Sequence, residues 1–198
     1  MNLAVFDFDK TITTKDTLID FLRFYVGEFK LSIGLFKCSP IILFYKLKIV
    51  SNQEAKESLL KHFFYDLSEA ELIKFGIEYS TKRLPEILSH EAMSRIHFHR
   101  KRNDTMVIIS ASPTYWFCDW CIQEGFTSVI GTLLEKKDGK MTGKIIGKNC
   151  FGDEKLRRLK QELPLEDYEY IYAYGDSKGD LALLNFASES YMKFKRFK

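Results

Sequence analysis

The chain has 198 residues, of which 45% are hydrophobic and 29% are charged, and its formal net charge is +3. A chain of this length and composition can bury a full hydrophobic core, which excludes a disordered or fibrous protein. The positive charge is too small to indicate nucleic-acid binding, and no arginine-rich stripe accompanies it, so we expect no nucleic-acid partner.

The cysteines and the first residues of the chain predict a cytoplasmic protein. No signal-peptide pattern is present at the N-terminus, so the four cysteines are expected to be reduced thiols. Cys118 and Cys121 form a CxxC pair, but no second pair of ligands stands at a spacing suited to zinc. We therefore interpret both as structural residues of a helix.

The most apolar stretch of the chain, residues 31–50, is not a candidate membrane span. Lys37, Pro40, Lys46 and Lys48 interrupt it, whereas a spanning helix needs about 20 consecutive apolar residues. We expect no transmembrane segment, and a peripheral contact with a membrane is left open.

In chain order, short apolar runs rich in valine, isoleucine and tyrosine predict buried strands. They cover residues 3–8, 106–110, 128–131, 170–174 and 191–194. Runs that are apolar throughout fit parallel strands with both faces covered better than strands with one wet face. Helical patterns separate most of them, so the sequence predicts an α/β fold in which helices flank a parallel sheet of about five strands.

The segment that follows the first predicted strand is helical in character throughout. Residues 51–54 and 68–71 each match the capping box that begins a helix. We therefore expect a helical cap of residues 16–102, inserted after the first strand. The core would then consist of residues 1–15 and 103–198.

Three further elements are predicted in the second half of the chain. Ser112 and Pro113 predict the start of a helix, as its N-cap and its first helical residue. Residues 133–148 contain an Asp-Gly pair between two alternating runs, which predicts a β-hairpin after the third strand. A later helix begins near Asp153 and ends before Pro164.

Two carboxylates, Asp7 and Asp9, stand at the end of the first predicted strand. In open α/β sheets, ligands bind at the carboxyl ends of the strands. Two like charges at one site are costly unless a cation neutralises them, and carboxylate oxygens suit Mg²⁺. One carboxylate could then attack phosphorus while the other transfers protons. From this segment alone, a polar strand terminus is an equally good interpretation.

A phosphate site is predicted at the end of the second strand. Ser110 ends that strand, and the amides of Ala111 and Ser112 precede the predicted helix. A hydroxyl group and free amides at a helix N-terminus can bind a phosphate group. Simple N-capping by Ser112 is the alternative.

Charged residues begin the last two predicted helices. Lys155 lies in the first turn of its helix, where the helix dipole disfavours a cation, so it indicates an anionic partner. Asp176 follows the fourth predicted strand through a glycine, and Asp180 opens the next helix, so both offer oxygen ligands for a metal ion. Taken singly, Lys155 is better interpreted as a surface lysine, and an Asp/Gly-rich loop with helix capping is the alternative for Asp176 and Asp180.

Four segments together resemble the four motifs of the haloacid dehalogenase (HAD) superfamily in order and spacing. They are Asp7-x-Asp9-x-Thr11, Ser110, Lys155 and Gly175-Asp176-x-x-x-Asp180. The helical segment after the first motif resembles the cap of the phosphoserine-phosphatase-like branch. The resemblance spans essentially the whole chain and implies a Rossmann-like core.

The resemblance also implies a magnesium-dependent phosphatase that acts through an aspartyl phosphate. Asp7 would be the nucleophile and Asp9 the general acid and base. Mg²⁺ would be held by Asp7, the backbone carbonyl of Asp9 and Asp176. Asp180 would complete the metal shell or position Lys155.

The substrate would contact a second set of residues, again by resemblance. This set contains Thr11, Asp16, Ser110, Ala111, Ser112 and Lys155. Ser110 and Lys155 would bind the phosphoryl oxygens. Asp16 falls where phosphoserine enzymes carry a substrate-binding glutamate.

The phosphoserine enzymes have two glycines after the serine that corresponds to Ser110. This chain has Ala111 and Ser112 at those positions. The aromatic, apolar segment 31–50 resembles the corresponding segment of the phosphatidylglycerophosphate phosphatases of the branch. We therefore expect a bulky or lipidic phosphate monoester as the substrate. A phosphatase for phosphoserine or another small metabolite, a phosphotransferase and a non-catalytic phosphate-binding module are the alternatives.

Overall fold

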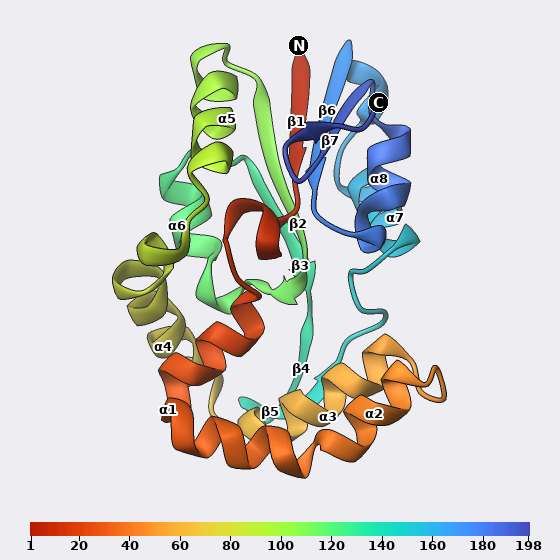
Figure 1. Cartoon of the computed structure of the whole chain (residues 1–198). Helices are drawn as coiled ribbons and strands as arrows, with labels where there is room; N and C mark the ends of the chain where they lie inside the picture. The colour runs from red at the N-terminus through yellow and green to blue at the C-terminus, as the bar shows by residue number, and fades with distance from the viewer.

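The computed structural model describes residues 1–198 and contains a central six-stranded sheet in the order β3-β2-β1-β6-β7-β8 (Figure 1). Five strands are parallel: β1 (Asn2–Phe6), β2 (Thr105–Pro113), β3 (Ser128–Thr132), β6 (Tyr170–Gly175) and β7 (Glu189–Met192). The short β8 (Lys195–Arg196) pairs antiparallel with β7. The predicted α/β fold with a parallel sheet of five strands is confirmed.

Both faces of the sheet are buried along its central strand β1, which explains the unbroken apolar run of residues 3–6. Along β1, Leu3 and Val5 belong to one apolar cluster, and Ala4 and Phe6 to the other, because successive side chains of a strand point to opposite faces. The helices α7 (Asp153–Glu162) and α8 (Leu181–Phe186) cover the Leu3 face. The helices α5 (His90–Lys101) and α6 (Cys118–Gln123) cover the Phe6 face.

Two strands end earlier than predicted. β1 stops at Phe6, and the chain turns through Phe8–Ile12, where Lys10 has a φ of 58°. The run expected over residues 191–194 leaves the sheet after Met192, because Lys193 and Phe194 have positive φ values of 51° and 58° and reverse the chain into β8. An apolar run predicts burial, but it does not mark where the backbone turns.

The segment between β1 and β2 is helical, as predicted. Its elements are α1 (Thr17–Lys37), α2 (Ser39–Lys46), α3 (Asn52–Phe64), α4 (Glu69–Lys82), the 3₁₀ turn Leu84–Ile87 and α5. Both predicted capping boxes, at the starts of α3 and α4, are formed. The two ends of the segment that contains α1 to α4 lie side by side, since Thr13 bridges to Leu88 and the amide of Ser89 donates to the carbonyl of Ile12 over 2.7 Å. The boundary of the cap at residue 102 stays a prediction.

The predicted β-hairpin is formed by β4 (Leu134–Lys137) and β5 (Lys140–Ile145). Asp138 and Gly139 connect them with φ values of 52° and 77°, as a tight hairpin turn requires. The hairpin packs against α3, at the edge of the molecule where α1 and α2 also lie (Figure 1).

The expected helix start at Ser112 and Pro113 is wrong. Both residues are the last of β2, and Pro113 pairs with Thr132 of β3. A 3₁₀ turn follows at Thr114–Trp116, and α6 begins only at Cys118. Pro113 has a φ of −61° and a ψ of 142°, so its ring fits the extended end of a strand as well as a helical turn.

The CxxC pair lies in α6 as two free thiols. Burial raises the pKa of both Cys118 and Cys121, so the reactive thiolate form is disfavoured at each.

None of the helices combines the length and the apolar character that a membrane crossing requires.

Candidate active site

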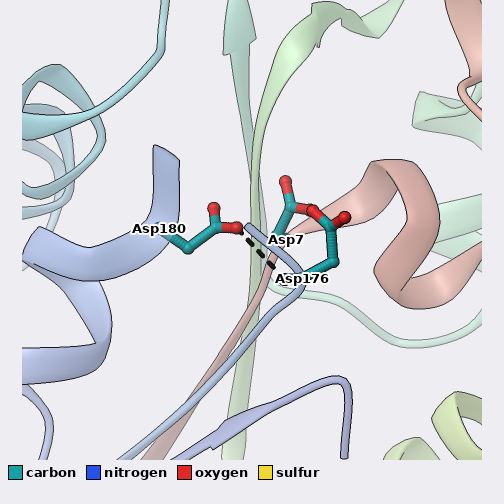
Figure 2. Close-up of side chains that lie close together, drawn as sticks. All are labelled: Asp7, Asp176 and Asp180. Carbon is teal, nitrogen blue, oxygen red and sulfur yellow. Dashed lines mark hydrogen bonds between the residues drawn. The ribbon is translucent and has the colours of Figure 1, made fainter. Parts of the chain in front are cut away.

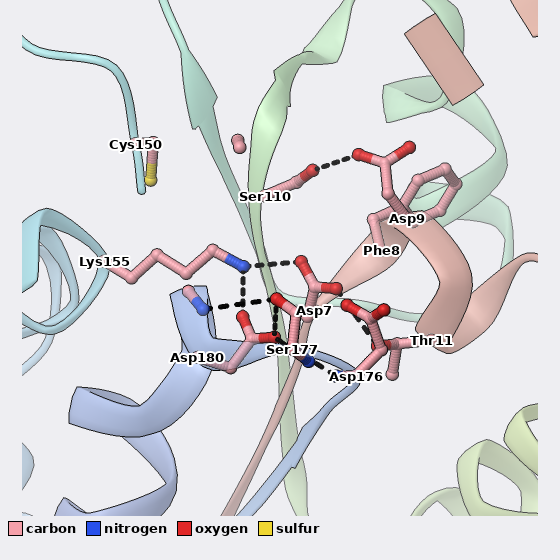
Figure 3. A network of polar contacts seen from close by, with 12 residues as sticks. Asp7, Phe8, Asp9, Thr11, Ser110, Cys150, Lys155, Asp176, Ser177 and Asp180 are labelled. Carbon is pink, nitrogen blue, oxygen red and sulfur yellow. Dashed lines mark hydrogen bonds and ion pairs between the residues drawn. The ribbon is translucent and has the colours of Figure 1, made fainter. Parts of the chain in front are cut away.

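The polar segments predicted to converge do meet at the carboxyl edge of the sheet. Asp7 follows β1, Ser110 lies in β2, Asp176 follows β6, and Lys155 is in the first turn of α7. Figure 3 shows these side chains pointing into one region from different elements. The parallel order of β2, β1 and β6 places these three strand ends side by side.

Lys155 joins two of the acidic residues at the centre of the site. Its Nζ atom lies 2.5 Å from Oδ1 of Asp7 and 2.6 Å from Oδ1 of Asp180. The three side chains are 3%, 6% and 1% exposed, in the order Lys155, Asp7 and Asp180. Burial opposes the charged ammonium, but the two carboxylates outweigh it and raise the pKa of Lys155. The unfavourable position of this lysine at a helix N-terminus is thus explained by its anionic partners.

Asp7 is a buried carboxylate whose two oxygens both have partners. Lys155 holds Oδ1, and the hydroxyl of Thr11 donates to Oδ2 over 3.0 Å. Burial, followed by the charges of Asp180 and Asp9, raises the pKa of Asp7 to about 8, although Lys155 opposes the shift. A single ammonium group therefore does not balance the negative charge gathered here.

Three carboxylates form a group suited to a cation. One oxygen each of Asp7, Asp176 and Asp180 lie within 4.8 Å of one another (Figure 2). Burial and the charge of Asp180 raise the pKa of Asp176. Both oxygens of Asp180 are already occupied, since Oδ1 holds Lys155 and Oδ2 accepts from the amides of Asp176 and Ser177 over 3.1 Å each. The oxygen donors and the excess negative charge fit Mg²⁺, with Asp7 and Asp176 as the carboxylates best placed to bind it.

Asp9 is held apart from this group. Its Oδ1 accepts from the amide and the hydroxyl of Thr17 over 2.6 and 2.5 Å. Its Oδ2 accepts from the hydroxyls of Ser112 and Ser110 over 2.6 and 3.1 Å. Its carboxylate therefore does not belong to the acidic group, and only its backbone carbonyl is left for the predicted metal contact.

The phosphate cradle expected at Ser110 and Ser112 has a different structure. Ser110 is fully buried, and its hydroxyl donates to Asp9 while it accepts from the amide of Ser112 over 3.0 Å. The helix N-terminus on which the expectation rested is absent, because the strand continues through Pro113. Thr11 likewise contacts Asp7 and does not line the cavity, so both hydroxyls orient carboxylates.

The site opens into a cavity of about 220 Å³, lined by fifteen residues of which three are hydrophobic. Asp7, Asp9, Asp16, Ala111 and Ser112 line it together with Lys155, Asp176 and Asp180. Asp16 caps α1 by accepting from the amide of Ile19 over 3.3 Å. A cavity this small and polar can enclose a phosphate group and a compact polar substituent.

Lys56 of α3 is a cavity residue that sequence reasoning did not identify. Its Nζ donates to the carbonyl of Ala111 over 2.9 Å and to Oδ1 of Asn149 over 3.0 Å. Burial lowers its pKa, although Asp9 and Asp16 oppose the shift. Its helix is predictable from the capping box, but no local pattern shows that this one lysine faces the sheet.

Asn52 and Phe151 mark the mouth of the cavity. They also line a second hollow of about 720 Å³, in which Phe151 is the only hydrophobic residue. Asn52 lies on α3 one helical turn before Lys56, and Phe151 precedes α7. The small cavity therefore continues into a larger polar groove.

The comparisons with known proteins concern both sequence and fold. A family model described as haloacid dehalogenase-like hydrolase matches residues 4–185. Protein CicA of Caulobacter vibrioides is 28% identical over 197 residues, which cover 99% of this chain and 87% of that protein. A histidinol-phosphatase of Neisseria meningitidis is 33% identical over 128 residues, which cover 62% of this chain and 58% of that protein.

Two solved structures illustrate the similarity of fold. A protein of unknown function from Bordetella pertussis has a TM-score of 0.83 at 24% identity, with 96% of this chain and 89% of that chain covered. A phospho-aspartyl intermediate analogue of phosphoserine phosphatase has a TM-score of 0.69 at 19% identity, with 96% and 85% covered.

Proposed function

Since this chain belongs to the haloacid dehalogenase-like hydrolase family, we propose that it is a magnesium-dependent phosphomonoester hydrolase with Asp7 as its nucleophile. The observation that carries the proposal is the buried contact of Asp7 with Lys155, beside the carboxylate of Asp176. Perturbed, buried ionisable groups in a cleft are typical of catalytic sites. Mg²⁺, held by Asp7, Asp176 and the backbone carbonyl of Asp9, would neutralise the charge of the phosphoryl oxygens.

In the first step, a carboxylate oxygen of Asp7 attacks phosphorus, and the bond from phosphorus to the leaving alcohol breaks. Asp9 gives its proton to the oxygen of that alcohol. Lys155 and Thr11 orient the attacking carboxylate, and Lys155 also faces the incoming phosphoryl group. Positioning of this kind supplies most of the catalysis in phosphoryl transfer.

In the second step, Asp9 takes a proton from water, and the water oxygen attacks the phosphorus of the aspartyl phosphate. The bond from phosphorus to Asp7 breaks, and inorganic phosphate is released. The hydroxyls of Thr17, Ser110 and Ser112 can each act as donor or acceptor, so the same contacts can hold Asp9 in both of its protonation states.

For the substrate, the cavity supports a polar phosphate monoester rather than the lipidic one that the sequence favoured. Only Leu18, Ala111 and Phe151 among its lining residues are hydrophobic, whereas a pocket for an acyl chain is lined mostly by apolar side chains. Lys56 adds a cation that can face an anionic substituent of the leaving group. The names of two similar proteins, histidinol-phosphatase and phosphoserine phosphatase, also refer to polar substrates.

The experiment that tests this function is a magnesium-dependent turnover assay followed by trapping of the intermediate. Hydrolysis of p-nitrophenyl phosphate should require Mg²⁺ and stop when a chelator is added, and mass spectrometry of the quenched enzyme should find a phosphoryl group on Asp7. A phosphoryl group on another residue would overturn the assignment. Phosphate binding without turnover would instead indicate a binding module.

A substrate panel separates the remaining alternatives. Phosphoserine, histidinol phosphate and lipid phosphate monoesters in vesicles should be compared in one assay, and we expect the polar esters to be preferred. Transfer of the phosphoryl group to an added alcohol at the expense of water would indicate a phosphotransferase, because the outcome depends on how well the closed site excludes water.

A further inference from the structure

A second surface with a distinct chemistry lies on the helices α1 and α2. Gly27 interrupts α1 with a φ of 79° and a ψ of 162°, so its first half and second half run in different directions. The first half buries Leu18, Phe21 and Leu22, whereas the second half runs with α2 along the edge of the molecule that is farthest from the chain termini (Figure 1). We call the exposed face of residues 29–49 the outer helical surface.

The outer helical surface is unusually rich in exposed apolar side chains. Phe29, Ile33 and Phe36 are spaced to form one stripe on α1, and the two phenylalanines are 79% and 80% exposed. Leu43 and Phe44 add exposed apolar groups on α2, a helix without any buried residue. Eight of the nineteen exposed large hydrophobic residues of the chain lie in this segment of 21 residues, so they form a concentration rather than a random scatter.

The charge of this segment has a single sign. Residues 29–50 contain Lys30, Lys37, Lys46 and Lys48 and no acidic residue. Lys30 and Lys37 each follow a phenylalanine of the stripe, two helical turns apart, so they border it along the same side. Exposed phenylalanines bordered by lysines are the combination that binds the interface of an anionic bilayer.

We propose that the outer helical surface docks this protein on membranes that contain anionic lipids. The phenylalanines enter the headgroup layer, and the four lysines contact the lipid phosphates. A second copy of the chain is a poorer occupant, because a symmetric contact would bring the two sets of lysines together. This inference is independent of the proposed function, since none of its residues lines the catalytic cavity.

Co-sedimentation of the full chain with vesicles tests the proposal. Vesicles of equal parts phosphatidylcholine and phosphatidylglycerol should sediment the protein, and vesicles of phosphatidylcholine alone should not. K30E/K37E should weaken binding by at least about 25-fold, because each lysine lost at an anionic surface weakens binding by about fivefold. F29S/F36S should weaken it by at least about tenfold, because it removes the apolar contact.

Two control variants make the same kinds of substitution outside the outer helical surface, so they test whether the position of the changes matters. K193E/K195E makes the same change of charge in the other basic cluster, at the C-terminus, and I122S removes an apolar side chain that is 61% exposed on α6. Both should bind vesicles as the parent protein does. Circular dichroism and turnover of p-nitrophenyl phosphate should stay unchanged in all four variants.

Three results would overturn the inference. One is the absence of binding to anionic vesicles, and another is equal loss of binding in K193E/K195E and K30E/K37E. The third is a dimer in light scattering that F29S/F36S converts to a monomer, which would assign the surface to self-association.

Discussion

Two buried carboxylates in this molecule, Asp7 at the end of β1 and Asp20 in α1, are in opposite electrostatic situations. Asp20 is 1% exposed. Its carboxylate accepts hydrogen bonds from Nε and Nη2 of Arg83 over 2.9 and 3.0 Å and from the hydroxyl of Tyr79 over 3.2 Å. Burial alone would raise its pKa, but the contacts with Arg83 and Tyr79 lower it below the ordinary value. The pKa of Asp7 is raised to about 8, because burial acts with two neighbouring carboxylates.

The difference lies in the balance between donors and acceptors. A bidentate arginine and a tyrosine satisfy Asp20, so it ties α1 to the end of α4 and serves the fold. Lys155 is shared between Asp7 and Asp180 while Asp176 adds a third carboxylate, so that cluster holds more carboxylates than cations. A buried carboxylate with matched partners is thus structural, and one with a deficit of positive charge indicates a site for chemistry.

The largest effect is expected when Asp7 is replaced by asparagine, which removes the nucleophile with almost no change of shape. Turnover of p-nitrophenyl phosphate should fall by about 10⁴-fold or more. The free energy of unfolding, measured with urea in magnesium-free buffer, should stay within about 1 kcal/mol of the parent value, because one source of repulsion is removed. Retained turnover would contradict the role of Asp7, and a large loss of stability would contradict the contrast with Asp20.

The same chemical change at Asp20 should have the reverse outcome. Asp20→Asn should lower the free energy of unfolding by about 2 kcal/mol, less than for a fully enclosed pair because the side chain of Arg83 is 27% exposed. The turnover number of the folded fraction should change by no more than about threefold, since Asp20 does not line the cavity. If stability is unaltered, the ion pair with Arg83 contributes nothing to the fold.

The smallest effect concerns how the difference in the free energy of unfolding between the parent protein and Asp20→Asn depends on pH. Because the pKa of Asp20 is lowered on folding, its contribution is present above the pKa of an unfolded aspartate, about 4, and is lost as the pH falls through the folded value. The stability gap between the parent and Asp20→Asn should therefore be full near neutral pH and shrink in acid. Urea unfolding at several pH values measures it, and a gap that widens in acid would contradict the assignment.

Most of the fold follows from local patterns in the sequence. Continuous apolar runs predict the five parallel strands, and the capping boxes predict the starts of α3 and α4. The prediction fails at Ser112 and Pro113, whose local preference for a helix start gives way to pairing with β3. Strand pairing is a long-range interaction, which no capping pattern reveals.

The candidate site is predictable where a residue follows a strand directly. Asp7 and Asp176 are found in this way, because topology alone brings strand ends together. Thr11 and Ser110 are predicted to contact the substrate, but their hydroxyls donate to the carboxylates of Asp7 and Asp9. The sequence shows that a hydroxyl is present but not which acceptor it will face. Lys56 could not be predicted because its place depends on how α3 packs against the sheet, far away in the chain.

The chain enters and leaves the segment of helices α1 to α4 at the neighbouring residues Thr13 and Leu88, which form an isolated bridge. A segment joined in this way can be lengthened, shortened or exchanged during evolution without altering the register of β1 with β2. Two contacts limit this freedom, because Thr17 of α1 holds Asp9 and Lys56 of α3 lines the cavity. Changes of length should therefore be tolerated best in the parts of the segment that are remote from these two residues.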